Sequence, residues 1–201
     1  MSTPGRPSTR PTTNYPSTHF LESSGAIPFI LSKRQIILIS RTLHDSTGHA
    51  ETEYILAKGR RNINETRLTN ALREVREETG YTCLPLPVTL DTRLCPAEEI
   101  PGVFTEDKVR VYENAVEPFM MNLKELWPGD VKVIWFFLAA VDESVPVETV
   151  NDSEVSGVQA FGYEEAVRRC TFEGDREVLR RAIALVEGTG RGGKEGMKPS
   201  G

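Results

Sequence analysis

The hydrophobic positions of the chain form several strand-like runs. Apolar and β-branched residues fill 24–31 and 35–40, and they predict two strands. The almost continuous apolar run 131–141 predicts a third strand, buried on both faces of its sheet. A further strand is expected near 109–116. Segment 82–90 is extended but broken by prolines, which suits an edge strand or an irregular crossing.

Two segments show the spacing of amphipathic helices instead. In 65–79 the apolar positions recur at i, i+3, i+4 and i+7, at Leu68, Ala71, Leu72 and Val75. A similar stripe occupies 175–187, and a shorter helix is expected at 163–170. Because strands precede, separate and follow these helices, the pattern predicts an α/β fold with a mixed β-sheet between helices.

The remaining segments set the expected domain boundaries. Residues 1–21 are rich in Pro, Ser and Thr and predict a disordered tail, since they bury too little apolar surface to offset the ordering entropy. One domain is expected over 22–187, followed by a flexible Gly- and Lys-rich tail over 188–201. Within the domain, 43–50 is a predicted polar loop. The long, proline-containing segment 95–130 is typical of a functional insertion.

Composition narrows the class of protein. A chain of 201 residues with 38% hydrophobic and 26% charged residues is typical of a soluble globular domain. Its net charge of −5 argues against a nucleic-acid-binding or anionic-membrane surface, and no apolar run approaches the roughly 18 residues that span a bilayer. The cysteines are irregularly spaced, at Cys83, Cys95 and Cys170. We therefore expect free thiols in a reducing compartment, the cytoplasm or the nucleus.

The helix predicted at 65–79 carries an acidic face beside its apolar stripe. Glu74, Glu77 and Glu78 are spaced i, i+3, i+4, which places three carboxylates within an arc of roughly 100°. Like charges at this spacing repel one another, so a divalent cation is the obvious group to neutralise them. For three glutamates alone, a solvated acidic face is the alternative interpretation.

The surrounding residues make this acidic face part of a longer pattern. Gly59 is followed after five residues by Glu65, and after seven more by Arg73-Glu74-Val75-x-Glu77-Glu78-x-Gly80-Tyr81. This order resembles the Nudix box at every specified position. The order of elements from about residue 22 to 187 is also similar to the Nudix fold. Asn64 stands where many relatives have glycine, but asparagine tolerates a left-handed backbone, so the turn is expected to survive.

The resemblance implies a Nudix-like α/β/α sandwich and a hydrolase of pyrophosphate linkages that uses Mg²⁺ or Mn²⁺. It identifies Glu74 and Glu78 as the principal metal ligands and Glu77 as a third. Gly59 serves backbone geometry, and its carbonyl is a further candidate ligand. The implied role of Arg73 is to orient the glutamates. Such a metal cluster neutralises phosphate oxygens and lowers the pKa of the attacking water.

The resemblance leaves two roles open. The general base is either Glu74 or an acid outside the box, because this role moves within the family. The candidates outside the box are Glu98, Glu99, Glu106, Glu148 and Glu154. Glu65 either reaches the metal site through water or only opens the helix, where a carboxylate complements the macrodipole.

A basic run, Lys58, Arg60 and Arg61, stands directly before the acidic helix. These groups are expected to bind substrate phosphates beyond the metal site; a solvated basic loop that compensates the glutamates is the alternative. The Lys-Gly-Arg run is similar to the branch of the family that cleaves diadenosine polyphosphates and diphosphoinositol polyphosphates. The expected partner is therefore a small-molecule polyphosphate, with no nucleic acid and no membrane.

The sequence is also compatible with other functions. One is the cleavage of ADP-ribose or of oxidised nucleoside triphosphates. Another is a non-catalytic Nudix module that binds nucleotide or protein, although such modules usually lose a box glutamate and all are present here. Phe104, Tyr112 and Trp127 of the insertion are candidates to stack on adenine, or simply loop anchors. Many Nudix enzymes dimerise, so a homodimer is one possible state of this chain, but no residue indicates an interface.

Overall fold

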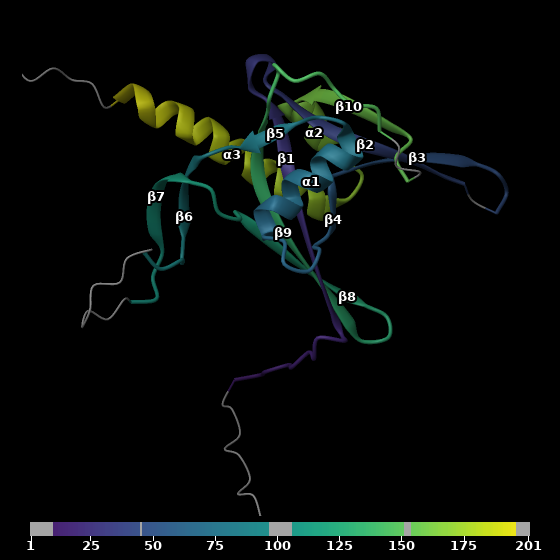
Figure 1. Ribbon diagram of the computed structural model, residues 1–201, viewed down its shortest axis with the longest axis horizontal. Coiled ribbons are helices and arrows are strands. Elements are labelled where there is room, and N and C mark those ends of the chain that lie inside the picture. Colours follow the sequence, from purple (N-terminus) through teal and green to yellow (C-terminus); the bar gives the residue numbers. More distant parts are fainter. Residues whose placement is uncertain (1–9, 45, 97–105, 151–153, 196–201) are drawn as a thin grey trace, which may run out of the picture.

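The computed structural model describes residues 10–44, 46–96, 106–150 and 154–195 (Figure 1). The strands are β1 (Phe20–Ile30), β2 (Gln35–His44), β3 (Ala50–Ile55), β4 (Lys58–Arg60), β5 (Cys83–Pro85), β6 (Val88–Thr92), β7 (Arg110–Ala115), β8 (Met120–Leu126), β9 (Asp130–Val141) and β10 (Gly157–Gly162). The helices are the short 3-10 helix η1 (Leu31–Lys33) and the α-helices α1 (Arg67–Thr79), α2 (Tyr163–Arg169) and α3 (Glu173–Glu195).

The larger of the two sheets is mixed. Its central strands β1 and β9 run parallel, with β2 antiparallel beside β1, and with β5 and β8 antiparallel beside β9. The order is β10-β2-β1-β9-β5, with β3 attached to β2 and β4 attached to β1, while β6 and β7 form a separate two-stranded sheet. The antiparallel pairing of β4 with β1 places Gly59 opposite Ser24, next to α1.

Helices cover both faces of this sheet (Figure 1). Adjacent residues of the central strands point to opposite sides, as the two-residue period of a strand requires. Ile27 and Phe136 join the core beneath α2 and α3, whereas Ala26 and Phe137 join the core beneath α1. The predicted α/β arrangement, with a mixed sheet between helices, is therefore confirmed.

Several element boundaries differ from the sequence prediction. Strands β8 and β10 were not predicted, because both are edge strands whose sequences lack a clear two-residue alternation. The predicted loop 43–50 instead contributes its ends to the β2–β3 hairpin. Helix α3 continues past Glu187, the predicted end, and Thr189 at that point accepts a 2.9 Å hydrogen bond from the backbone N–H of Thr89. Residues 1–9 and 196–201 of the two predicted tails lie outside the described residues.

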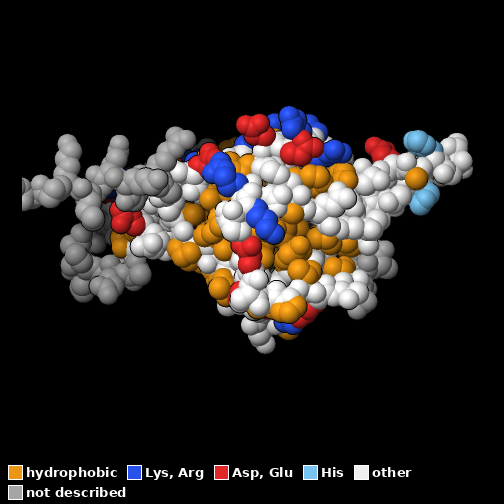
Figure 2. Space-filling view, turned by 90° about the horizontal axis from the view of Figure 1, so that it is seen from above, with side chains coloured by type: hydrophobic (Ala, Val, Ile, Leu, Met, Phe, Trp, Pro, Cys, Tyr) orange, Lys and Arg blue, Asp and Glu red, His pale blue; other side chains and the backbone are white. Residues whose placement is uncertain are grey.

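The three cysteine thiols differ in their exposure to solvent. Cys83 and Cys170 are buried free thiols, and Cys95 is an exposed one. No helix in the described part of the chain is long and apolar enough to cross a membrane. On the face shown in Figure 2, acidic and basic side chains are interspersed rather than gathered into a broad patch of one sign.

Candidate functional site

The ends of α1 are fixed by local backbone chemistry. The helix begins at Arg67, two residues later than predicted, because Thr66 caps it: the Thr69 N–H donates to Thr66 Oγ1 at 3.1 Å. Asn64 has a φ of 65°, the left-handed conformation expected for it. Gly80 ends the helix with a φ of 74°, and a Cβ there would lie 2.1 Å from the Glu148 carbonyl oxygen. The box glutamates are thus held at defined positions along one helix.

Glu74 is the most enclosed of the three glutamates. It is 9% exposed, and its neighbours Ala71 and Val75 are fully buried against the sheet. Burial is the largest influence on the Glu74 carboxyl and raises its pKa, while the Arg73 guanidinium acts in the opposite direction. The raised pKa means that this carboxylate is held ionised only at some electrostatic cost, which a bound cation would relieve.

Strand β4 lies directly against the carboxylates of α1. A Cβ at Gly59 would lie 2.0 Å from Glu74 Oε2, so only glycine leaves room for this carboxylate. One residue earlier, the backbone N–H of Lys58 donates to Glu78 Oε2 at 2.9 Å. The backbone of β4, itself paired to β1, therefore positions two of the three glutamates.

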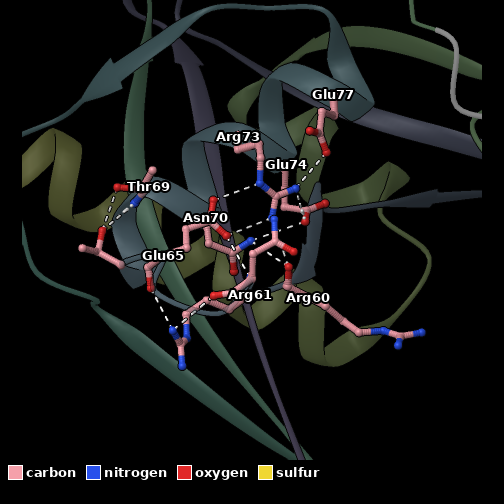
Figure 3. A network of polar contacts seen from close by, with 10 residues as sticks. Arg60, Arg61, Glu65, Thr69, Asn70, Arg73, Glu74 and Glu77 are labelled. Carbon is pink, nitrogen blue, oxygen red and sulfur yellow. Dashed lines mark hydrogen bonds and ion pairs between the residues drawn. The ribbon is translucent and has the colours of Figure 1, made fainter.

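The Arg73 guanidinium joins the acidic residues of the box (Figure 3). Its Nη1 lies 2.8 Å from both Glu74 Oε1 and Glu77 Oε2, and its Nε donates to Glu65 Oε1 at 2.9 Å. Its Nη2 donates to the Arg60 carbonyl at 3.0 Å. Hydrogen bonding to Glu65 is the main reason that the pKa of Arg73 is raised, so the group stays charged. The Arg73 guanidinium thus connects helix α1 to the end of β4.

The two arginines of the basic run point in different directions (Figure 3). Arg61 Nε donates to Glu22 Oε2 at 2.7 Å, and its Nη1 donates to the Glu65 carbonyl at 2.8 Å. Glu22 also accepts from Trp135 and from Arg67, whose guanidinium stacks 4.2 Å above the Trp135 ring. Arg61 therefore belongs to a network at the start of α1, whereas the Arg60 side chain is exposed.

The pocket that contains Glu78 is more basic than the sequence alone indicated. Its volume is about 310 Å³, and its charged lining residues are Arg41, Lys58, Glu78, Lys124, Lys132, Glu154 and Asp175. The half-buried Lys58 donates through Nζ to the Leu56 carbonyl at 3.0 Å, and this Nζ lies 4.0 Å from Asp175 Oδ2. Burial lowers the pKa of Lys58. Sequence reasoning missed Lys124 and Lys132, although Lys132 interrupts the apolar run of β9 and could have signalled a functional position.

Three of the five candidate acids outside the box belong to the described residues. Glu98 and Glu99 lie outside the described residues. Glu106 and Glu148 form ion pairs with a neighbouring lysine and arginine away from this pocket. Glu154 is the one of the five that the described structure places in the pocket of Glu78.

Of the three candidate aromatic residues of the insertion, the two that the structure describes do not line this pocket. Phe104 is outside the described residues. The Tyr112 hydroxyl donates to the Leu94 carbonyl at 3.3 Å, and Trp127 is 95% exposed at the turn between β8 and β9. Phe172 is the aromatic residue that lines the pocket among the described residues.

A larger hollow of about 910 Å³ follows the exposed side of α1. Arg73 and Glu77 line it, but Glu74 and Glu78 do not. The pocket of Glu78 therefore combines more of the chemistry that a phosphate substrate requires.

The donor set suits a hard divalent cation. Glu74, Glu77, Glu78 and the Gly59 carbonyl offer only oxygen, the ligand type that Mg²⁺ and Mn²⁺ prefer. The space left by the missing Cβ of Gly59 is filled by the Glu74 carboxylate. Across the described residues, no three His, Cys, Asp or Glu side chains converge on one point. An ion here would take one or two carboxylates and complete its shell with water and substrate oxygens, as Mg²⁺ commonly does.

Known proteins share a sequence family and a fold with this chain. A family model described as "NUDIX domain" matches residues 21–182. The fold is similar to a NUDIX hydrolase from Nitrosomonas europaea (TM-score 0.53, 13% identity), covering 82% of this chain and 88% of that one. It is also similar to the E. coli ORF135 protein (TM-score 0.51, 17% identity), covering 89% of this chain and 95% of that one. A third similar structure is a C. elegans Ap4A hydrolase in a binary complex (TM-score 0.51, 16% identity), covering 84% of this chain and 98% of that one. No curated protein matches the chain.

Proposed function

Because this chain belongs to the Nudix family, we propose that it is a metal-dependent pyrophosphohydrolase of phosphate-dense substrates, either diphosphoinositol polyphosphates or diadenosine polyphosphates. The family and its hydrolase neighbours support pyrophosphate hydrolysis. The substrate class and the residue roles are the parts that we propose. The intact set of box glutamates favours an enzyme over a non-catalytic binding module.

One observation carries the substrate class. The pocket that holds Glu78 is also lined by Lys58, Lys124, Lys132 and Arg41. A diphosphate linkage next to Glu78 would therefore have cations beside it for additional phosphate groups. ADP-ribose carries only its two linked phosphates and uses few of these cations, so it suits the pocket less well. The similarity to an Ap4A hydrolase in fold is compatible with a polyphosphate substrate.

We assign the metal ligands to the residues that β4 positions. Glu78, Glu74 and the Gly59 carbonyl would hold Mg²⁺ or Mn²⁺, with Glu77 as an additional ligand. When bound, the ion neutralises phosphate oxygens and lowers the pKa of a bound water. Arg73 orients Glu74 and Glu77 through its contacts of 2.8 Å to each.

The remaining roles concern proton transfer and phosphate binding. Glu74, with its raised pKa, and Glu154, in the same pocket as Glu78, are the two candidates to accept the water proton. Lys58 and the exposed Arg60 bind substrate phosphates. Arg61 and Glu65 act mainly on the shape of the loop before α1, since both side chains are engaged there. We expect the enzyme to work in the cytoplasm or nucleus, where its free thiols stay reduced.

A substrate panel tests this function. Inositol pyrophosphates, diadenosine polyphosphates, ADP-ribose and nucleoside triphosphates would be incubated with Mg²⁺ or with chelator, and the products identified by phosphorus NMR. Glu78→Gln keeps the side-chain shape and removes one charge, so we expect loss of hydrolysis. Glu164→Gln on the exposed start of α2 is the matched control and should behave like wild type. If wild-type protein is inert toward the whole panel with metal present, the proposed activity is wrong.

A further inference from the structure

Two lysines face each other across the β8–β9 ladder. Lys124 and Lys132 are direct cross-strand partners in this antiparallel pair. Like charges in directly opposite positions destabilise a sheet, because their side chains share one face at close range. Within the described residues, neither lysine forms an ion pair with a carboxylate. The pair therefore has an electrostatic cost that the fold itself does not explain.

Both lysines line the pocket of Glu78, together with Lys58. The pKa of Lys132 is lowered, first by burial and then by the repulsion of Lys58, Lys124 and Arg60. The Glu74 carboxylate acts on Lys132 in the opposite direction. Lys132 is half-buried in the pocket, whereas Lys124, which also lines it, is exposed.

The other charges of the pocket already have partners. Arg41 Nε donates to Glu53 at 2.9 Å, and Lys58 lies 4.0 Å from Asp175. Glu78 accepts from the Lys58 backbone N–H, and its carboxylate is committed to the metal when the ion is bound. Among the described residues, the Lys124–Lys132 pair is then the cationic group of the pocket that has no ion pair with a carboxylate.

We propose that Lys124 and Lys132 form a distal anion subsite, which binds a phosphate group outside the diphosphate linkage that is hydrolysed. This inference rests on the proposed function and deepens it, because it sets a minimum for the substrate. The preferred substrates carry at least three phosphate groups, either in one chain or distributed over a polyol. Lysine suits this role, since its ammonium is a point charge on a flexible stem and tolerates different phosphate positions.

The test measures anion binding without turnover. Inorganic tripolyphosphate would be titrated calorimetrically into the full chain in low-salt buffer with chelator. Lys124→Met and Lys132→Met keep most of the side-chain length and should each weaken binding at least about tenfold, as expected for a lost charge-assisted contact. Lys132→Arg should bind within about threefold of wild type, since it retains the charge. Lys108→Met is the control, because Lys108 pairs with Glu106 outside the pocket.

A second readout does not depend on the ligand. Removing one member of a repelling pair should leave unchanged or raise the melting temperature in low salt without multivalent anions, and the difference should shrink as salt is added. Unchanged tripolyphosphate affinity in both Met variants would overturn the subsite, and so would an equal loss in Lys108→Met.

The subsite and the proposed function fail in different ways. If the chain binds tripolyphosphate through the lysines but hydrolyses nothing in the panel, the subsite stands and the proposed function is wrong. If the enzyme is active and both Met variants slow ADP-ribose and polyphosphate cleavage by the same factor, the function stands and the subsite is overturned. A loss of kcat/KM confined to substrates with three or more phosphates supports both.

Discussion

Replacing Gly59 with alanine should separate stability from metal binding. The added Cβ would lie 2.0 Å from Glu74 Oε2, 2.1 Å from its Cδ and 2.4 Å from its Oε1. All three atoms belong to the end of a flexible side chain, so the carboxylate can rotate away while the backbone stays in place. Since burial already disfavours the ionised Glu74, moving it toward water recovers part of its hydration.

Gly25→Ala is the matched control for this change. Gly25 lies on β1 and pairs with Lys58 of β4, one residue from Gly59. Its Cβ would lie 2.4 Å from the Ala57 carbonyl oxygen, a backbone atom that cannot move without disturbing the strand pair. Overpacking of this kind costs about 1–3 kcal/mol. For a chain of this size that lowers Tm by roughly 2–4 °C per kcal/mol.

The two variants should therefore differ in their melting temperatures. Gly59→Ala should melt within about 2 °C of wild type, but bind Mn²⁺ more weakly and lose about 100-fold in kcat, as a displaced reactive group does. Gly25→Ala should show a clearly lower Tm, because a backbone atom of the strand pair must move. Calorimetry, Mn²⁺ titration by electron paramagnetic resonance and steady-state kinetics measure these quantities. A Gly59→Ala protein with normal Mn²⁺ affinity would refute the assignment of Glu74 as a ligand positioned by Gly59.

Three further predictions concern groups outside the glutamate cluster. Burial raises the pKa of both the Cys83 and Cys170 thiols to about 12, so a thiol reagent at pH 8 should label only exposed Cys95 in the native protein. Although burial acts to raise the pKa of Glu22, its hydrogen bonds with two arginines lower it below the ordinary 4.5. Its stabilising contribution is thus present above pH 4.5 and is lost as the pH falls through the lowered pKa, so Glu22→Gln should flatten acid denaturation in that range. Asn70 is fully buried, and its amide donates to the Arg60 carbonyl at 3.1 Å, so Asn70→Ala should lower the free energy of unfolding by about 1–3 kcal/mol.

Each of these has a simple contradicting outcome. Labelling of two or three thiols in the native protein would show that the cores around them open readily. Parallel acid-denaturation curves for wild type and Glu22→Gln would mean that the arginine contacts do not hold this carboxyl ionised. A urea midpoint unchanged by Asn70→Ala would mean that this buried amide contributes no net hydrogen-bond energy.

The sequence predicted what depends on local periodicity and spacing. The helix with Glu74, Glu77 and Glu78 and the buried strand 131–141 follow from patterns that act within a few turns or one strand. The contact between Gly59 and Glu74 was not predicted, because it depends on how β4 is placed against α1. The sequence did not predict that the lysines of β8 and β9 lie in the pocket of Glu78, because β8 lacks a clear alternation of apolar and polar residues.

Edge elements were the least predictable part of the fold. Strand β10 is bounded by Gly157 and Gly162 and pairs with β2 along one side, so its own sequence carries little of the reason for its conformation. The extension of α3 beyond Glu187 runs against glycine's low helix propensity and depends on tertiary contacts such as that of Thr189. Both outcomes are set by neighbours that are distant in the chain.

The carboxylates and the paired lysines come from different parts of the chain, which affects how such an enzyme can acquire new substrates. The carboxylates are tied to β4 and α1, whereas the paired lysines come from the hairpin of β8 and the first half of β9 (Figure 1). With the roles proposed above, reactivity and selectivity would reside in separate modules of the chain. Substitutions in the hairpin would then change which substrates are accepted while the hydrolytic residues stay unchanged, so paralogues with new substrates would arise in few mutational steps.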